Sequence, residues 1–353
     1  MRLFRKLGRR LGNLSTDFLR SDRFVISQGS IFVRSQAETK RISSLLSERW
    51  PQAGRGTAYI RLFEFGQTRE ISVLISGIGR FGNSIVQVNN AVAIALALQA
   101  NCVLFFRYDA IQNVSVVLPA SILMGPIRPL SSRPQNPQLI CKTDGIFPEG
   151  ILFDPCSTIS QGVSSRLREA LGIDLAPTRN LDNALTIHLR SGDVFSENPH
   201  SAYGQPPWAF YLRILKSRKW EEVVLVSEDT KNPNWTAIRD WCKLNSMTIR
   251  LAGGEFQQAL KALLQARNLV LSRGTFASSA ALLAPGKKRL YFFGTNPDSL
   301  ICASSHEVFR VSDQSGEYTA SVLSKNWKNT EAQLNLMKTF PLSKVSQPTL
   351  FTR

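Results

Sequence analysis

The sequence predicts an α/β fold built from parallel sheets, and three observations support this prediction. Short apolar, β-branched runs alternate along the chain with longer stretches whose apolar residues follow the helical period. Turn-forming residues separate the two kinds of segment. The length of 353 residues exceeds what one hydrophobic core usually serves, which predicts two domains.

The alternation extends over most of the chain. Strands are predicted at residues 71–76, 101–106, 184–189, 222–227, 247–251, 268–272 and 289–294. Helices are predicted at residues 83–99, 161–171, 207–217, 233–244, 255–266 and 276–284. The proline-rich stretch 111–150 breaks the pattern, and the polar segment 174–183 separates its two halves.

We therefore expect two Rossmann-like halves that meet near residue 180. The predicted parts are a basic helix with its lead-in, a first and a second Rossmann-like domain, and a tail with a helix that folds back. Their expected ranges are 1–69, 70–180, 181–314 and 315–353.

Composition narrows the class of protein. With 43% apolar and 20% charged residues, the chain should fold throughout. The five cysteines contain no Cys-x-x-Cys pair, and the three histidines lie far apart in the sequence. This spacing argues against a zinc site and against a disulfide framework, and it fits a reducing compartment.

Charge is the least ordinary property of the composition. There are 43 Lys and Arg against 26 Asp and Glu, a formal net charge of +17. Such an excess favours polyanions, an anionic membrane face or phosphate-bearing substrates, although a merely solvated basic surface would have the same composition.

The N-terminal residues 2–20 form a basic amphipathic pattern, with leucines and phenylalanines on one helical face and arginines on the other. Such a helix could lie on the inner face of the membrane or pack on the protein body. No stretch reaches about 18 uninterrupted apolar residues. We expect a cytoplasmic protein, with a peripheral membrane contact as an option.

Glycines follow the first predicted strand at positions 77, 79 and 82, the spacing of a dinucleotide-binding turn. Such a site needs an acidic residue at the end of the second strand, where this chain has Arg107. Arg107 could suit a 2′-phosphate. An NADP-dependent oxidoreductase that uses Gly77, Gly79 and Gly82 therefore remains an alternative.

The second half carries a more informative motif in ALTIHLRSGD at 184–193. His188 and Arg190 alternate with apolar residues, so both should point to one face at the carboxyl edge of the sheet, with Asp193 just beyond. Arg190 could bind phosphate or form a salt bridge with Asp193. His188 could bind a ligand or be a core histidine.

Two further strand ends should lie at the same edge. Glu228 and Asp229 could accept hydrogen bonds from a purine, or be acids at the start of a helix. Thr275, Ser278 and Ser279 open a predicted helix, where they could surround an anion or act as caps. Together with Arg190 they predict a nucleotide diphosphate site. The chain has no Asp-x-Asp motif, and we expect no metal.

The segment between the Arg190 motif and the next helix is rich in aromatic residues. Tyr203 and Gln205 are candidates for contact with a sugar acceptor, whereas Phe210 and Tyr211 are expected to pack in the core.

These motifs resemble those of the fucosyltransferase superfamily, which includes α1,2-, α1,6- and protein O-fucosyltransferases. The resemblance rests on GIGRFGN at 77–83, HLRSGD at 188–193, VSED at 226–229 and LSRGTFASSAALLA at 271–284. It implies the GT-B architecture, two Rossmann-like domains facing across a cleft. Two departures are Ser191, where many α1,2 enzymes have a second arginine, and the lack of tryptophans in the last motif.

The resemblance also implies roles for individual residues. Arg190 would bind the β-phosphate of GDP-fucose, His188 and Asp229 would contact guanine, and Thr275, Phe276 and Ser278 would contact phosphate. The glycine-rich loop, with Gly79, Gly82 and Asn83, would lie across the cleft from the nucleotide. Glu197 is the first candidate for the catalytic base, and Asp193 the second.

The resulting prediction is an inverting, metal-independent transferase without a cofactor. It would move fucose from GDP-fucose to a hydroxyl of a glycan or lipid-linked acceptor in surface polysaccharide synthesis, and nucleic acid is not an expected partner. A noncatalytic protein that binds glycans or polyanions through its positive charge is a third alternative.

Overall fold

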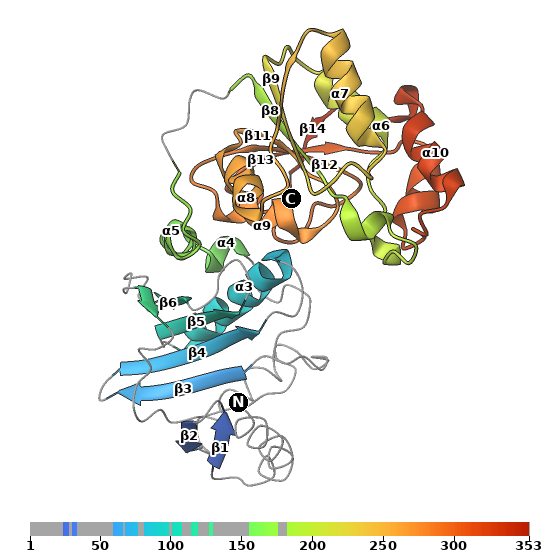
Figure 1. Cartoon of the computed structure of the whole chain (residues 1–353). Coiled ribbons are helices and arrows are strands. Elements are labelled where there is room, and N and C mark those ends of the chain that lie inside the picture. The colour runs from blue at the N-terminus through green and yellow to red at the C-terminus, as the bar shows by residue number, and fades with distance from the viewer. Residues whose placement is uncertain are drawn as a thin grey trace, which may run out of the picture. The chain divides into compact units, whose positions relative to one another are not determined.

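A computed structural model describes most of the second half of the chain and parts of the first (Figure 1). The described ranges are 24–27, 30–33, 59–65, 68–76, 81–98, 101–107, 114–118, 127–129, 155–175 and 182–352. The chain divides into two compact units, residues 1–79 with 86–153 and residues 80–85 with 154–353. The predicted four-part division, with its boundary at residue 180, stays a prediction.

The first unit contains a sheet with the strand order β3-β4-β5-β6-β7 and a separate β1-β2 hairpin. Strand β4 (Thr68–Ser76) leads through α3 (Phe81–Leu98) to the parallel strand β5 (Asn101–Arg107), as predicted. The other pairings in this sheet are antiparallel, which the sequence analysis did not predict. The remaining strands are β1 (Phe24–Ser27), β2 (Ser30–Val33), β3 (Tyr59–Phe65), β6 (Val114–Leu118) and β7 (Ile127–Pro129).

The second unit contains a seven-stranded sheet with the order β10-β9-β8-β11-β12-β13-β14. Strands β8 to β13 are parallel and β14 pairs antiparallel at the edge. The bounds are β8 (Ala184–Leu189), β9 (Glu222–Ser227), β10 (Thr248–Leu251), β11 (Asn268–Val270), β12 (Arg289–Phe293), β13 (Glu307–Val311) and β14 (Thr349–Leu350). This sheet confirms the predicted α/β class.

The order of the parallel strands reverses between β8 and β11. The chain runs outward from β8 to β10, returns to the middle of the sheet, and then runs outward the other way from β11 to β13. This is the strand order of a doubly wound Rossmann-like sheet, in which ligands bind beyond the carboxyl ends of the strands where the order reverses. The residues that follow β8 and β11 therefore occupy the expected ligand position.

Helices cover both faces of this sheet (Figure 1). On one face lie α6 (Trp208–Leu215), α7 (Asn234–Leu244) and α10 (Glu331–Thr339), and on the other α8 (Phe256–Gln265) and α9 (Thr275–Leu283). Every strand and helix predicted for residues 155–294 is present, within three residues at each end. Helix α10 confirms that the C-terminal tail adds a helix, and it packs beside α6.

Side-chain alternation in β8 explains how both faces are filled. Leu185, Ile187 and Leu189 belong to the core beneath α6 and α7, together with Phe210 and Tyr211 of α6. Phe210 and Tyr211 are both fully buried, so their predicted packing in the core is confirmed. The alternate residues of β8 point to the α8 and α9 face.

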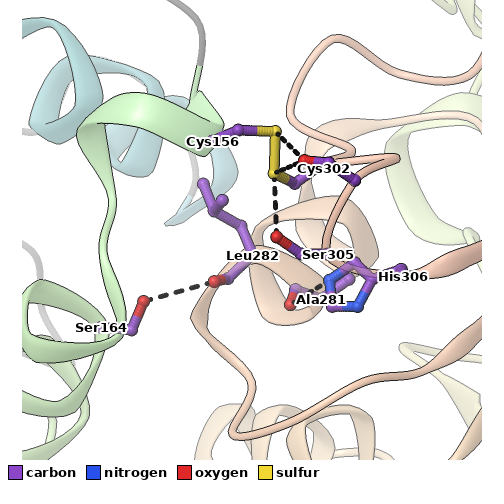
Figure 2. Close-up of a disulfide and its surroundings, with 8 residues drawn as sticks. Cys156, Ser164, Ala281, Leu282, Cys302, Ser305 and His306 are labelled. Atoms are coloured by element: carbon purple, nitrogen blue, oxygen red, sulfur yellow. Dashed lines mark hydrogen bonds between the residues drawn. A yellow bond between two sulfur atoms is a disulfide. The ribbon is translucent and has the colours of Figure 1, made fainter. Parts of the chain in front are cut away.

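A disulfide joins Cys156 of α4 (Pro155–Thr158) to Cys302 in the loop between β12 and β13 (Figure 2). Helix α5 (Gln161–Ala170) continues this attachment, since Ser164 Oγ donates to Leu282 O of α9 at 3.4 Å. The argument against disulfides missed this bridge, because the two cysteines are 146 residues apart and form no spacing pattern.

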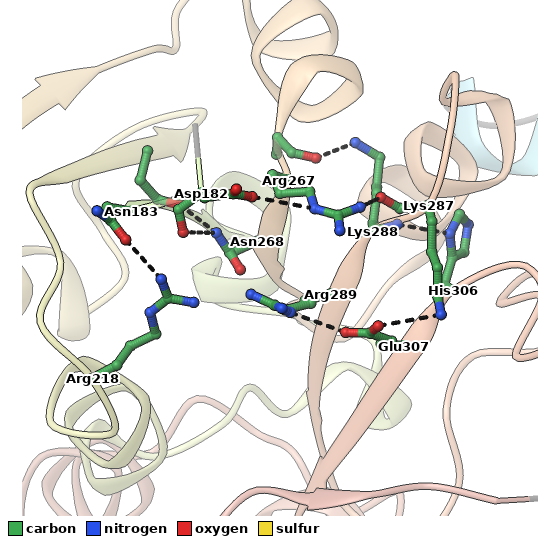
Figure 3. A network of polar contacts seen from close by, with 12 residues as sticks. Asp182, Asn183, Arg218, Arg267, Asn268, Lys287, Lys288, Arg289, His306 and Glu307 are labelled. Carbon is green, nitrogen blue, oxygen red and sulfur yellow. Dashed lines mark hydrogen bonds and ion pairs between the residues drawn. The ribbon is translucent and has the colours of Figure 1, made fainter. Parts of the chain in front are cut away.

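A polar network holds the amino ends of the central strands, opposite to the ligand edge (Figure 3). Asn268 Nδ2 donates to the carbonyls of Asp182 and Ala184, both at 2.9 Å, and so connects β11 to β8. Lys288 Nζ donates to Leu264 O at 2.9 Å at the C-terminal end of α8. The network joins strands and caps a helix, which is a structural role.

No described helix is both long enough and apolar enough to cross a membrane. The predicted amphipathic helix at residues 2–20 lies outside the described residues. Its suggested contact with an anionic membrane stays a prediction.

Candidate functional site

Arg190 is the first residue after β8 and projects to the α8 and α9 face, as its alternation with Leu189 predicted. Its side chain is 15% exposed. The guanidinium lies next to Gly274, where a Cβ would come within 3.2 Å of Arg190 Cδ and closer still to Nη1. Arg190 therefore lies at the carboxyl end of β8, next to β11 and beside the first residues of α9.

Two side chains hold the guanidinium in the described part of the chain. Nη2 lies 3.4 Å from Asp193 Oδ2, so the ion pair considered in the sequence analysis is present. The ring of Tyr203 lies under the guanidinium, with Arg190 Cζ 4.0 Å from its centroid. Arg190 Nε is buried and donates no hydrogen bond to any described residue. Much of the donor capacity of this side chain is therefore available to an anion.

His188 lies one step deeper in β8 and is 7% exposed. Its Nδ1 is 2.6 Å from Ser272 Oγ, and its ring meets Phe276 of α9 edge to face at 5.5 Å. Burial, and to a smaller extent the charge of Arg190, lower the pKa of His188 to about 3. The imidazole is therefore neutral at pH 7 and leaves Arg190 as the cation of this strand end.

Asp229 fixes the loop that follows β8. Its Oδ1 accepts hydrogen bonds from Ser191 Oγ and from the backbone N–H groups of Lys231 at 2.9 Å and Gly192 at 3.4 Å. Burial acts to raise the pKa of the Asp229 carboxyl, but these hydrogen bonds together outweigh it and lower the pKa. Asp229 thus joins the ends of β8 and β9, which differs from the alternative role of an acid at a helix start, and its contact with a purine stays a prediction.

The other acidic candidates are more exposed. Glu228 lies beside Gly192, whose Cβ would come within 2.6 Å of Glu228 Oε2. The side chain of Asp193 is 47% exposed. Glu197 is exposed in the loop after the 3₁₀ helix Gly192–Phe195. Asp193 is the carboxylate that directly contacts Arg190.

Helix α9 begins at Thr275, with Gly274 as its N-cap at a positive φ of +136°. The backbone N–H groups of a first helical turn have no partner within the helix, and they favour anions. Ser278 and Ser279 are buried, and their hydroxyls have no hydrogen-bond partner among the described residues. The start of α9 therefore supplies amide donors next to the Arg190 guanidinium.

The first turn of α3 belongs to the same unit and packs on the start of α9. Thr275 Oγ1 donates to Asn83 Oδ1 at 3.2 Å, and the Phe81 ring lies edge to face with Phe276 at 5.8 Å. A Cβ on Gly82 would collide with the Thr275 side chain. The close approach that needs Gly82 is thus to Thr275, while Gly77 and Gly79 lie outside the described residues.

Gln205 has a structural role at this edge of the sheet. It is fully buried, and its Nε2 donates to Tyr203 O at 2.8 Å and to Arg273 O at 3.1 Å, while Oε1 accepts from Arg273 N at 3.2 Å. These bonds connect the segment after Arg190 to the loop that leads into α9. A buried side chain with these partners does not fit the suggested contact with an acceptor.

The structure brings together most of the predicted site residues of the second half. Arg190, Asp193, His188, Thr275 and Phe276 surround the switch point, and Asn83 joins them from α3. The sequence analysis missed Asn232, whose Nδ2 donates to Arg190 O at 2.9 Å. No pattern marked it, because Asn232 lies 42 residues from Arg190 in the sequence.

Comparisons of the chain with protein-family models, with curated proteins and with solved structures gave no match. The argument for function therefore depends on the residues and their geometry.

Proposed function

We propose that the protein is a glycosyltransferase that binds a nucleoside diphosphate sugar at the switch point of its second unit. One observation carries the proposal: Arg190 directly follows β8, and its guanidinium lies beside the amino end of α9. A guanidinium offers paired donors to phosphate oxygens, and helix amides add donors of fixed direction. The position is where doubly wound sheets bind nucleotides.

The proposed donor is GDP-fucose, and the acceptor is a hydroxyl of a glycan or lipid-linked glycan. The resemblance of HLRSGD and the other motifs to fucosyltransferases supports this choice of sugar and base. On this proposal the chain has the two-domain GT-B arrangement, in which the first unit contributes the acceptor side. A working site on the inner face of the cell membrane belongs to the same proposal.

The proposed reaction is a single displacement with inversion. The acceptor oxygen attacks C1 of fucose while the bond from C1 to the β-phosphate oxygen breaks, and the electron pair of that bond leaves with GDP. Negative charge develops on the diphosphate, where Arg190 and the α9 amides would stabilise it. A carboxylate removes the proton of the acceptor hydroxyl, with Glu197 as first candidate and Asp193 as second.

Thermal unfolding of the full-length protein with GDP, GDP-fucose, UDP, ADP or NADPH, in EDTA, tests the proposal. A ligand that binds only the folded state raises the unfolding midpoint. We expect GDP and GDP-fucose to raise it and the other ligands to leave it unchanged. Arg190→Ala should remove this shift, because hydrogen bonds to charged groups contribute about 1.5–3 kcal/mol each.

Arg250→Ala is the matched control, since Arg250 is an exposed arginine on the edge strand β10 that pairs with Glu222 of β9. It should keep the GDP shift. A shift with UDP alone would indicate a UDP-sugar as the donor, and a shift with NADPH alone would favour the oxidoreductase alternative. In a transfer assay, Glu197→Gln and Asp193→Asn would then separate the two candidate bases.

A further inference from the structure

The ring of Tyr203 contacts Arg190, whereas the sequence suggested a contact with the sugar acceptor. Arg190 Cζ lies 4.0 Å from the ring centroid, well within the range of a cation–π contact. The tyrosine ends the 3₁₀ helix Ser201–Tyr203 and is partly exposed. The ring thus contacts the guanidinium, whose Nη1 lies next to Gly274 at the start of α9.

The ion pair of Arg190 is a weaker restraint. The Arg190 Nη2 to Asp193 Oδ2 distance is 3.4 Å, and the Asp193 side chain is 47% exposed. Ion pairs in contact with solvent contribute little and are screened by salt. We therefore expect the contact with the Tyr203 ring to restrain the guanidinium at least as firmly as the carboxylate does.

Tyr203 is itself fixed relative to α9. Gln205 Nε2 donates to Tyr203 O and to Arg273 O, and Tyr318 Oη donates to Gln205 O at 2.6 Å. Gln205 and Tyr318 are both fully buried. The side-chain amide of Gln205 thus binds both the segment that carries the Tyr203 ring and the loop that enters α9. These bonds fix the position of the ring relative to the start of the helix.

We propose that Tyr203 is a positioning residue, whose ring holds the Arg190 guanidinium with its donors toward the amino end of α9. The inference rests on the proposed function, because its consequence is tighter binding of a nucleoside diphosphate there. A donor group that already has the required orientation needs no reorganisation when the anion binds or when its charge increases.

The first test measures GDP affinity by calorimetry for the full-length wild type, Tyr203→Phe and Tyr203→Leu. Tyr203→Leu removes the ring and should weaken binding about two- to thirtyfold, the range of a cation–π contact. Tyr203→Phe keeps the ring and should stay within about twofold of the wild type. Equal affinity for Tyr203→Leu and wild type would overturn the inference, as would a Phe variant as weak as the Leu variant.

Trp235→Leu is the matched control. Trp235 of α7 also stacks on an arginine, with Arg239 Cζ 5.1 Å from its ring, and Arg239 also pairs with an aspartate, Asp240. This variant removes a similar pair outside the proposed site and should leave GDP affinity unchanged. A loss as large as that of Tyr203→Leu would mean a general effect on folding and would contradict a specific role of Tyr203.

A measurement without ligand separates this inference from the proposed function. The Nε–Hε NMR signal of Arg190, assigned with Arg190→Lys, should show the ring-current shift of a stacked tyrosine. Tyr203→Leu should abolish the shift and Tyr203→Phe should keep it. A wild type that shows the shift but binds no GDP would contradict the proposed function, whereas a signal unchanged in Tyr203→Leu would contradict the positioning role.

Discussion

His188 in β8 and Arg190 just beyond it point to the same face of the sheet, yet they contribute differently to the site. His188 is buried against Ser272 and Phe276, and its pKa is lowered to about 3, so it carries no charge at pH 7. Arg190 is one residue beyond the strand, where its guanidinium reaches the start of α9. The sequence analysis could place both on one face, but it could not separate a core histidine from a ligand-binding one.

Gly274 allows the close approach between Arg190 and α9, which predicts the effect of Gly274→Ala. Its φ of +136° is a conformation that residues with a side chain rarely adopt, and the new Cβ would displace the guanidinium. We expect a loss of about 1–3 kcal/mol in the free energy of unfolding. We also expect loss of the thermal shift with GDP.

Gly294→Ala is the control for backbone strain alone. Gly294 has a φ of +123°, and a Cβ there would have no neighbour within 4 Å. It should lose similar stability and keep the GDP shift. If Gly274→Ala also kept the full shift, the guanidinium would not need its position beside Gly274.

At the scale of elements, the two ends of α9 have different partners. Its last carbonyls accept hydrogen bonds from Ser164, Arg168 and His306, whereas the amides of its first turn face the Arg190 side of the sheet. Sequence periodicity predicted α9 because a helix is a local structure. The partners at its C-terminal end come from distant segments, so no local pattern could reveal them.

The same reasoning separates the predicted strands from the missed ones. The largely apolar and buried strands β8 and β9 were clear in the sequence. Strand β13, next to the edge, carries the exposed Arg310, and the edge strand β14 consists of two residues, Thr349 and Leu350. Strands at an edge contribute fewer buried residues, so their apolar signal is too weak to distinguish them from loops.

The disulfide attaches α4 and α5 to the body of the second unit, so its loss should lower stability. Cross-links that close long loops typically contribute about 2–4 kcal/mol, largely by restricting the unfolded chain. We expect the double variant Cys156→Ser, Cys302→Ser to unfold at a lower temperature than the wild type. Calorimetry of both proteins, with and without a reductant, measures the effect.

The reductant also provides the control. It should lower the unfolding midpoint of the wild type to that of the double variant and leave the double variant unchanged, because that variant lacks the Cys156–Cys302 bridge. A wild-type midpoint that is high and indifferent to reductant would show that the bridge does not contribute.

At the scale of the whole molecule, the sequence predicted an α/β class but not the order of strands. The pairing of β8 with β11 brings Leu185 next to Asn268, 83 residues later in the chain, and no local signal encodes it. That pairing creates the switch point. The site residues were therefore recognisable as strand ends at one edge and by resemblance, while the strand order that creates the switch point depended on tertiary structure.

Buried histidines predict how global stability depends on pH. Burial lowers the pKa of His306 to about 4, as it lowers that of His188. Between pH 6.5 and about 4 the unfolded chain binds more protons than the folded one, so the free energy of unfolding should decrease as pH falls. Each histidine contributes up to about 1.4 kcal/mol per pH unit.

Denaturant unfolding of wild type and His306→Gln across this range measures the contribution. Glutamine can replace both hydrogen bonds of His306, to Lys288 N and Ala281 O, and does not titrate. The variant should lose less stability on acidification, and at pH 8 its stability should be close to that of the wild type. Parallel pH profiles would contradict the buried, neutral state of His306.

The first turn of α3 belongs to the second unit, although the residues on both sides of it belong to the first. The two units therefore cannot be separated by one cut in the gene. A single cut after codon 153 would leave Phe81, Gly82 and Asn83 on the N-terminal fragment. The C-terminal fragment would then lack Asn83, the hydrogen-bond partner of Thr275. Two separately expressed halves would need a short peptide spanning residues 80–85 added back to complete the second one.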